Sequence, residues 1–281
     1  MTQEPTASPP IATDRTTVAV LGTGTMGEAV VVGLIAAGRP PSTILITARR
    51  PERARDLESR LGVRAVPNAE AASADVLVLA VKPGDMAVLL SELAPDLRPG
   101  CLVISVAAGL PTWWFDRRLP EGTPVVRVMP NTPVAVGEGM SLLCGGAHAT
   151  EEHLTQAEGL MTPLGRVARV PEHLFDAATA LAGSGPAYHF LFTEALIEAG
   201  VLLGLPRALA RDLAVQTAYG SARMLRDTDL GATALREQVT SPGGTTIAAL
   251  RQFEEHGLRA AAFDALEAAR DRGREMGHAY Q

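Results

Sequence analysis

One short stretch in the second half of the chain gathers groups that could bind an acidic small molecule. TSPGGTTIAAL, residues 240–250, holds one proline, two glycines and four hydroxyl side chains in a region otherwise rich in alanine. Pro242 and the glycines predict that one helix ends here and that another spans residues 245–253. A helix start presents backbone N–H groups without helical partners and a partial positive charge, which together favour a carboxylate. The residues predicted to bind it are Ser241, Gly243, Gly244, Thr245 and Thr246.

Ordinary helix punctuation is the alternative interpretation of this turn. An N-cap would explain Ser241, but it does not explain two glycines and four hydroxyls side by side. The hydroxyls of Ser241 and Thr246 are neutral near pH 7 and can donate or accept a hydrogen bond. We therefore favour a binding site over a simple break between helices.

A second candidate site lies near the start of the chain. VAVLGTGTMGEAV, residues 18–30, carries three glycines in the spacing G-x-G-x-x-G between a predicted strand and a predicted helix. Gly22 allows a tight turn, Gly24 lets a pyrophosphate approach the backbone, and Gly27 lets the helix pack closely. A glycine turn without a ligand is the alternative, which the flanking strand and helix disfavour. The residues predicted to bind a dinucleotide here are Gly22, Thr23, Gly24, Thr25, Met26 and Gly27.

The end of the predicted second strand bears on which dinucleotide binds. NAD-binding proteins usually carry a carboxylate about 20 residues after the glycine turn, where it accepts the ribose 2′-hydroxyl. This chain has Arg49 and Arg50 instead, and guanidinium groups fit a 2′-phosphate. We therefore expect NADP(H) to be preferred, with NAD(H) possible. Solvated loop charges are the alternative interpretation of these two arginines.

Three further loops are candidates for the same ligands. In open α/β sheets, ligands bind beyond the carboxyl ends of the strands, so AVKPG (residues 80–84) and RVMPNTPVAVGEG (residues 127–139) are expected there. The second of these is a stiff, polar turn, and rigid loops in this position commonly carry functional groups. AGSGPAY, residues 182–188, interrupts a long helical pattern. A simple kink is the alternative for this last loop, because Pro186 suits the first turn of a helix.

The elements that position these loops form two groups. From residue 16 to residue 170, short apolar runs alternate with helical stretches, which is typical of βαβ units. Runs apolar on consecutive residues, such as VLVLAV, indicate strands covered on both faces, as in a parallel sheet between two helix layers. The predicted strands span residues 17–21, 43–47, 76–81, 102–106 and 125–129, with one or two more between residues 140 and 170. The predicted helices of this part span residues 28–37, 52–61 and 85–93.

After Pro171 the strand pattern ends. Residues 172–182, 187–203, 207–226 and 260–277 are predicted to be helices rich in alanine and leucine. Several look apolar over more than half their circumference, which suits burial against a partner subunit, although they could also bury one another within one chain. The predicted fold class is α/β: a disordered tail (1–15), a Rossmann-type parallel sheet domain (16–170) and an all-helical dimerisation domain (171–281).

Composition excludes several classes of partner. The 281 residues carry a net charge of −6 without a basic cluster, which argues against nucleic acid and anionic membranes. No apolar run approaches the roughly 18 residues of a membrane span, and the first residues lack a secretory pattern, so we expect a cytoplasmic protein. Cys101 and Cys144 are predicted to be buried and unpaired. The six histidines never fall at zinc-ligand spacing, so no metal is expected.

The motifs GTGTMG, AVKP, RVMPNTP, AGSGPAY and TSPGGTTIAAL together resemble the pyrroline-5-carboxylate reductase family, in order along nearly the whole chain. The resemblance implies reduction of L-1-pyrroline-5-carboxylate to L-proline by hydride from NAD(P)H, the last step of proline biosynthesis. It implies that the turn at residues 241–246 holds the substrate carboxylate and that the catalytic hydroxyl of Thr246 reaches the ring nitrogen. It also implies further cofactor-binding residues: Ala80, Val81, Lys82 and Pro83 along the nicotinamide ribose, Asn131 near the nicotinamide and Asn68 at the adenosine 2′-position.

The resemblance further implies an interlocked homodimer, five of which form a decamer, with the site between subunits. One alternative is an NADP-dependent reductase of another cyclic imine or keto acid on the same scaffold, which should vary TSPGGTT. Another is a non-catalytic NADP-binding regulatory protein, which needs no carboxylate turn. Alcohol oxidation by the β-hydroxyacid dehydrogenase route is disfavoured because Lys82 is the only lysine and the helical part has none.

Overall fold

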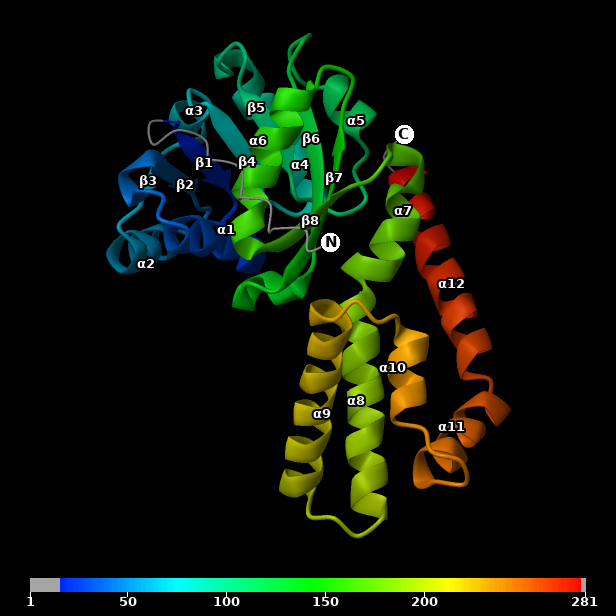
Figure 1. Ribbon diagram of the computed structural model, residues 1–281. Coiled ribbons are helices and arrows are strands. Elements are labelled where there is room, and N and C mark those ends of the chain that lie inside the picture. Colours follow the sequence, from blue (N-terminus) through cyan, green and yellow to red (C-terminus); the bar gives the residue numbers. More distant parts are fainter. Residues whose placement is uncertain (1–15, 279–281) are drawn as a thin grey trace. The chain divides into compact units, whose positions relative to one another are not determined.

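The computed structural model describes residues 16–278 (Figure 1). The predicted disordered tail, residues 1–15, lies outside the described residues. The described chain forms two compact units: residues 16–184 together with 269–278, and residues 185–268. The predicted boundary after residue 170 stays a prediction, and the last turns of the chain pack with the first unit.

The first unit is built on one eight-stranded sheet in the order β3-β2-β1-β4-β5-β6-β7-β8 (Figure 1). Neighbouring strands from β3 to β6 are parallel. The order reverses at β1, so the loops that leave β1 and β4 meet at a topological switch point. The strands are β1 Val18–Leu21, β2 Ile44–Thr47, β3 Arg64–Ala65, β4 Val76–Leu79, β5 Leu102–Ser105, β6 Val125–Pro130, β7 Gly139–Gly145 and β8 Gly165–Arg169.

The sheet departs from the predicted all-parallel pattern at one pair. β6 and β7 run antiparallel, whereas β7 and β8 are parallel. Only the short 3-10 helix η3, Thr132–Val136, joins β6 to β7. A parallel crossover needs a dozen or more residues, so the chain reverses direction here. One or two further strands were expected between residues 140 and 170, and two are present, β7 and β8.

Helices cover both faces of this sheet, as the consecutive apolar runs predict. Val18 and Val20 of β1 pack into one core layer, while Ala19 and Leu21 pack into the other, because successive side chains of a strand point to opposite faces. α1, α2 and α6 contribute to the first layer, and α3, α4 and α5 to the second. These helices are α1 Thr25–Ala36, α2 Pro51–Leu61, α3 Asn68–Ala71, α4 Pro83–Leu93, α5 Thr112–Asp116 and α6 Glu151–Met161, with short 3-10 helices η1 Pro41–Thr43, η2 Ala94–Asp96 and η4 Thr162–Leu164.

After β8 the described chain is entirely helical, as expected. The single helix predicted over residues 172–182 is instead a 3-10 turn, a short α-helix and a π-helical turn. None of the helices in residues 16–278 is long and apolar enough to cross a membrane. The elements are η5 Glu172–Leu174, α7 Phe175–Ala178, η6 Thr179–Gly183, α8 Gly185–Leu202, α9 Arg207–Asp227, α10 Ala232–Gln238, α11 Thr245–Glu255 and α12 Leu258–His278.

A buried arginine anchors the start of this helical segment to the sheet. Arg127 of β6 has a side chain only 7% exposed, and its guanidinium bonds Glu172 of η5 at 2.6 Å. It also lies 4.0 Å from the ring centroid of Phe175. The thiol of Cys144 on β7 donates to the same Glu172 at 2.9 Å. The contacts satisfy a charge that would be costly to bury alone, and both cysteines are buried and unpaired as predicted.

The unit of residues 185–268 leaves many large apolar side chains uncovered. Phe190 and Leu191 of α8 are each 66% exposed, and Phe263 of α12 is 70% exposed. Exposed apolar patches of this kind mark surfaces that another molecule covers. Among the described residues these helices bury one another's apolar faces only in part, for example where the rings of Phe192 and Phe253 lie 5.7 Å apart.

Candidate functional site

The glycine turn after β1 is held in shape by contact with the loop after β4. Gly22 has φ +94°, a conformation that residues with a Cβ rarely adopt, and a Cβ there would lie 2.8 Å from the Val81 nitrogen. The Ala80 N–H donates to the Leu21 carbonyl at 2.8 Å, which brings the two loops together. Gly22 is therefore required by the close approach of two backbones.

The next two glycines of the spacing differ in function. A Cβ on Gly27 would lie 2.0 Å from the Gly22 carbonyl oxygen, so Gly27 lets α1 start directly against the turn. A Cβ on Gly24 would meet nothing within 4 Å. Gly24 is the N-cap of α1, and no side chain caps this helix. The first-turn N–H groups therefore face an open cradle of the kind that receives phosphate oxygens.

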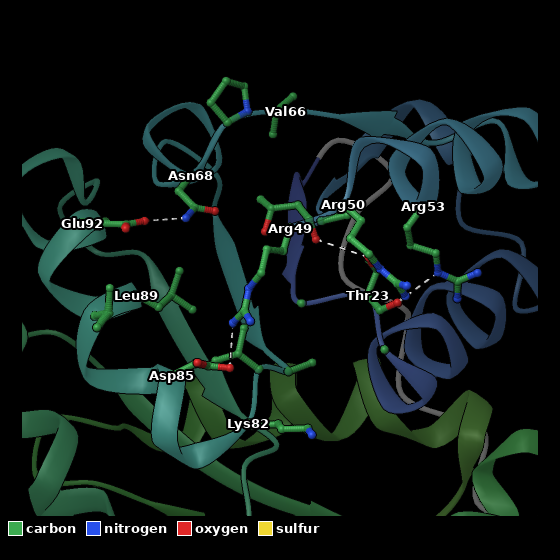
Figure 2. A pocket seen from close by; sticks show the side chains of 18 residues that line it. Thr23, Arg49, Arg50, Arg53, Val66, Asn68, Lys82, Asp85, Leu89 and Glu92 are labelled. Carbon is green, nitrogen blue, oxygen red and sulfur yellow. Dashed lines mark hydrogen bonds and ion pairs between the residues drawn. The ribbon is translucent and has the colours of Figure 1, made fainter.

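A pocket of about 890 Å³ opens beside this cradle (Figure 2). It lies at the carboxyl ends of β1, β2 and β4, where open α/β sheets bind their ligands, and its size suits a large organic cofactor. Nine of the predicted cofactor-binding residues line it: Gly22, Thr23, Gly24, Arg49, Arg50, Asn68, Ala80, Val81 and Lys82.

Polar groups in the pocket already have partners from α4. Arg49 forms an ion pair with Asp85 at 2.8 Å, and the Asn68 amide Nδ2 donates to Glu92 at 2.7 Å. Figure 2 shows both pairs reaching the same helix, one from the loop after β2 and one from the start of α3. The guanidinium of Arg50 has no hydrogen bond or ion pair with any part of the chain that the structure describes, so it is the available one.

Arg53, which the sequence analysis did not select, supports the glycine turn. Its Nε donates to the Thr23 carbonyl at 3.2 Å, and its guanidinium also pairs with Glu28. Arg60 bonds the same carboxylate at 2.6 Å. This Arg60 bond lowers the pKa of Glu28, and Arg53 adds to it in the same direction against the opposing effect of burial. Arg53 lies one helical turn after Arg50, and that spacing is the signal that could have found it.

The other predicted cofactor residues lie outside this pocket. Thr25 lines an adjoining pocket of about 510 Å³, whereas Met26 and Gly27 belong to the first turn of α1 and Pro83 begins α4. Both ends of the Asn131 amide are engaged: Oδ1 accepts from the Met140 N–H at 2.8 Å, and Nδ2 donates to the Ala182 carbonyl at 3.0 Å. Asn131 thus ties the loop after β6 to the π-helical turn, and its approach to a nicotinamide stays a prediction.

The turn TSPGGTT lies between α10 and α11, as predicted. The Gly244 N–H donates to the Ser241 carbonyl at 3.1 Å, and Gly243 has φ +70°, as in a type II β-turn with Pro242 at its second position. The expectation that the Gly244 N–H is free therefore needs correction, because the turn itself uses this donor. A Cβ on Gly244 would lie 2.4 Å from the Ser241 hydroxyl oxygen, which can rotate away, and 3.2 Å from the Ser241 carbonyl oxygen.

The donors that remain lie at the start of α11. No side chain caps this helix, so the N–H groups of Thr245 and Thr246 are left without helical partners. The hydroxyls of Ser241, Thr245 and Thr246 have no bonds to the described residues, whereas the Thr240 hydroxyl donates to the Arg236 carbonyl at 2.6 Å. Locally the turn has the donors and the shape of a carboxylate receptor.

Comparisons with known proteins define first the class and then the family. The strand order, the glycine turn and the pocket at the switch point define a Rossmann-type dinucleotide-binding fold, and the family matches add the class of oxidoreductase. Residues 17–109 match the family described as NADP oxidoreductase, coenzyme F420-dependent, and residues 172–276 match the family described as pyrroline-5-carboxylate reductase dimerisation.

The similarity to individual proteins extends over nearly the whole chain. Pyrroline-5-carboxylate reductase of Corynebacterium melassecola is 46% identical over 93% of this chain and 99% of its own length. The Coxiella burnetii reductase structure has a TM-score of 0.89 at 38% identity, covering 93% of this chain and 98% of that chain. The Plasmodium falciparum enzyme, solved with NADP bound, gives 0.84 at 30% identity, covering 94% and 99%. The chain belongs to the pyrroline-5-carboxylate reductase family.

Proposed function

We propose that this protein reduces L-1-pyrroline-5-carboxylate to L-proline with a hydride from NAD(P)H. The observation that carries the proposal is the TSPGGTT turn, whose uncapped helix start and free hydroxyls suit a small cyclic imine with one carboxylate. A dehydrogenase scaffold alone would not require that turn. We also expect the enzyme to act in the cytoplasm, where unpaired thiols such as Cys101 and Cys144 are ordinary.

The pocket residues fit a dinucleotide. The cradle at Gly24 and the N–H groups of α1 suit the pyrophosphate, because a side chain at residue 24 would project into that space. Arg50 is free for the adenosine 2′-phosphate, with Arg49 and Asn68 beside it. The loop at residues 80–83 and Asn131 are assigned to the nicotinamide end. A nicotinamide bound there supplies the hydride.

The turn at residues 241–246 supplies substrate orientation. Backbone N–H groups around Gly243 and Thr245, with the Ser241 hydroxyl, receive the carboxylate, and the Gly244 N–H closes the turn on the Ser241 carbonyl. The Thr246 hydroxyl bonds the ring nitrogen. Addition of hydride to a C=N carbon is easier when the nitrogen is protonated, so a positioned hydroxyl and a solvent proton suffice without a strong general base.

Two threonines of the same segment provide the test. Thr246→Ala removes the hydroxyl assigned to the ring nitrogen, whereas Thr240→Ala removes one that bonds only the Arg236 carbonyl. Steady-state oxidation of NADPH with L-1-pyrroline-5-carboxylate should fall about 10–100-fold in kcat/KM for Thr246→Ala, a loss of roughly 1.4–2.7 kcal/mol. Thr240→Ala should stay within about threefold of the parent. Equal losses in both variants would overturn the role of Thr246.

We further propose that the helical part forms a homodimer and that five dimers assemble into a decamer. The match to a dimerisation family over residues 172–276 and the exposed apolar side chains of α8 support self-association. Light scattering coupled to gel filtration gives the molar mass, and a monomer at micromolar concentration would contradict both levels of assembly.

A further inference from the structure

Helix α4 presents two carboxylates to the adenosine end of the pocket. Asp85 and Glu92 lie seven residues apart, two helical turns, so they share one face of α4 with the pocket-lining Leu89. Asp85 holds Arg49 at 2.8 Å, and Glu92 holds the Asn68 amide at 2.7 Å. Two of the three donors assigned to the adenosine 2′-position are thus already bonded to α4.

Of the three guanidinium groups that line the pocket, only that of Arg50 is without a partner in the described chain. Arg50 lines both pockets and is bonded to no described side chain. Arg53 lines them too, but it is committed to Glu28 and the Thr23 carbonyl. The carboxylates of α4 therefore decide how many of the pocket's donors a ligand can recruit without first breaking a bond.

We propose that Asp85 and Glu92 are specificity-determining residues that restrain the preference for NADP(H) over NAD(H), an inference that rests on the proposed function. To recruit Arg49 and Asn68 as further donors beside Arg50, a 2′-phosphate must exchange with the carboxylates that now hold them. The displaced carboxylates stay nearby and repel the phosphate. A 2′-hydroxyl has no charge to repel, and it can donate a hydrogen bond to a carboxylate. Each carboxylate thus weakens the binding of NADP(H) without weakening the binding of NAD(H).

Substitution by the neutral amide should separate the two cofactors. Asp85→Asn and Glu92→Gln should each tighten NADP⁺ binding about 3–10-fold, because Arg49 and Asp85 are 80% and 45% exposed and water screens the repulsion. NAD⁺ binding should stay the same or weaken. Asp85→Ser and Glu92→Ala remove the carboxylates without adding an amide that can bond Arg49 or Asn68. They should also raise the ratio of the NAD⁺ to the NADP⁺ dissociation constant.

The experiment is calorimetric titration of the full chain with NADP⁺, NAD⁺ and 2′,5′-ADP, without the imine substrate. The matched control is Glu121→Gln, which removes one exposed carboxylate away from the pocket, and thermal unfolding of each variant checks the fold. A rise in the ratio of NAD⁺ to NADP⁺ dissociation constants in the α4 variants alone supports the proposal, and tighter 2′,5′-ADP binding locates the gain at the adenosine half.

Two results would overturn the proposal. A ratio that is unchanged, or that falls, would mean that the carboxylates serve only to orient Arg49 and Asn68 for the phosphate. A parent protein that binds neither dinucleotide would overturn the cofactor assignment and this inference with it. Normal NADP⁺ binding without imine reduction would instead count against the proposed function alone, so the two failures are distinguishable.

Discussion

At the scale of single residues, two glycines of the turn after β1 are needed for different reasons, Gly22 for folding and Gly24 for ligand binding. Gly22 has both a positive φ and a backbone neighbour closer than a Cβ allows, whereas Gly24 has neither. A side chain at residue 22 would therefore lower the free energy of unfolding. A side chain at residue 24 would instead weaken the binding of the ligand that occupies the cradle.

Gly22→Ala and Gly24→Ala test this difference. We predict that Gly22→Ala lowers the free energy of unfolding by about 1–3 kcal/mol, because it combines strain with overpacking. Gly24→Ala should change stability by less than about 1 kcal/mol but weaken NADP⁺ binding at least about tenfold. Urea unfolding and calorimetric titration measure the two quantities, and parent-like NADP⁺ binding by Gly24→Ala would contradict the assignment of the cradle.

At the scale of elements, a carboxylate joins the two helices that flank the glycine turn. Glu28 of α1 accepts bonds from Arg53 and Arg60 of α2, and Arg53 also holds the Thr23 carbonyl. These partners lower the pKa of Glu28, with the Arg60 bond the largest cause. A carboxylate whose pKa is lowered by folding stabilises the protein above its unfolded pKa, about 4.3, and loses that contribution as the pH falls through the folded pKa.

Glu28→Gln should therefore destabilise the protein in a pH-dependent way. We predict a loss of about 1 kcal/mol at pH 7 that shrinks as the pH falls below about 4, because the parent then protonates Glu28. Thermal unfolding of parent and variant between pH 7 and pH 3 measures the difference. Glu52→Gln, an exposed carboxylate of the same helix pair, is the control. A difference that is constant with pH would rule out the ion pairs as its cause.

The element scale also shows what the sequence could predict. Strands buried on both faces are continuous apolar runs, so β1, β2, β4, β5 and β6 were placed within a few residues. β3 was missed because Arg64 and Ala65 form only two residues of edge strand with no apolar run. The helix predicted over residues 172–182 breaks into three turns because both of its ends are held by tertiary contacts that periodicity does not reveal. Arg127 of β6 bonds Glu172 at the start, and Asn131 of the following loop bonds the Ala182 carbonyl near the end.

The candidate site was predictable to the same extent. Glycine spacing, loop position and, for Asn68, the family resemblance identified nine lining residues of the pocket. Asp85 and Glu92 were missed because their partners, Arg49 in the loop after β2 and Asn68 at the start of α3, are brought to α4 only by the tertiary fold. The bonded state of the Gly244 N–H depends on the turn type, which the composition of TSPGGTT leaves open.

At the scale of the whole molecule, the exposed apolar side chains of α8 predict self-association. Leu191→Glu places a charge on a surface that is 66% exposed in the single chain, so the isolated fold should tolerate it while an apolar interface should not. We predict a shift of the molar mass to that of the monomer in light scattering. Val136→Glu, 76% exposed on η3, is the matched control and should keep the parent's mass. Unchanged mass for Leu191→Glu would exclude this surface from the interface.

The most direct test of the proposed function follows the product as well as the cofactor. Purified protein is mixed with L-1-pyrroline-5-carboxylate and a limiting amount of NADPH, and proline is quantified by chiral chromatography. We predict one L-proline formed for each NADPH oxidised, with slower turnover when NADH replaces NADPH. Binding of NADP⁺ without any proline, at every imine concentration tested, would contradict the proposal and favour another imine or a sensing role.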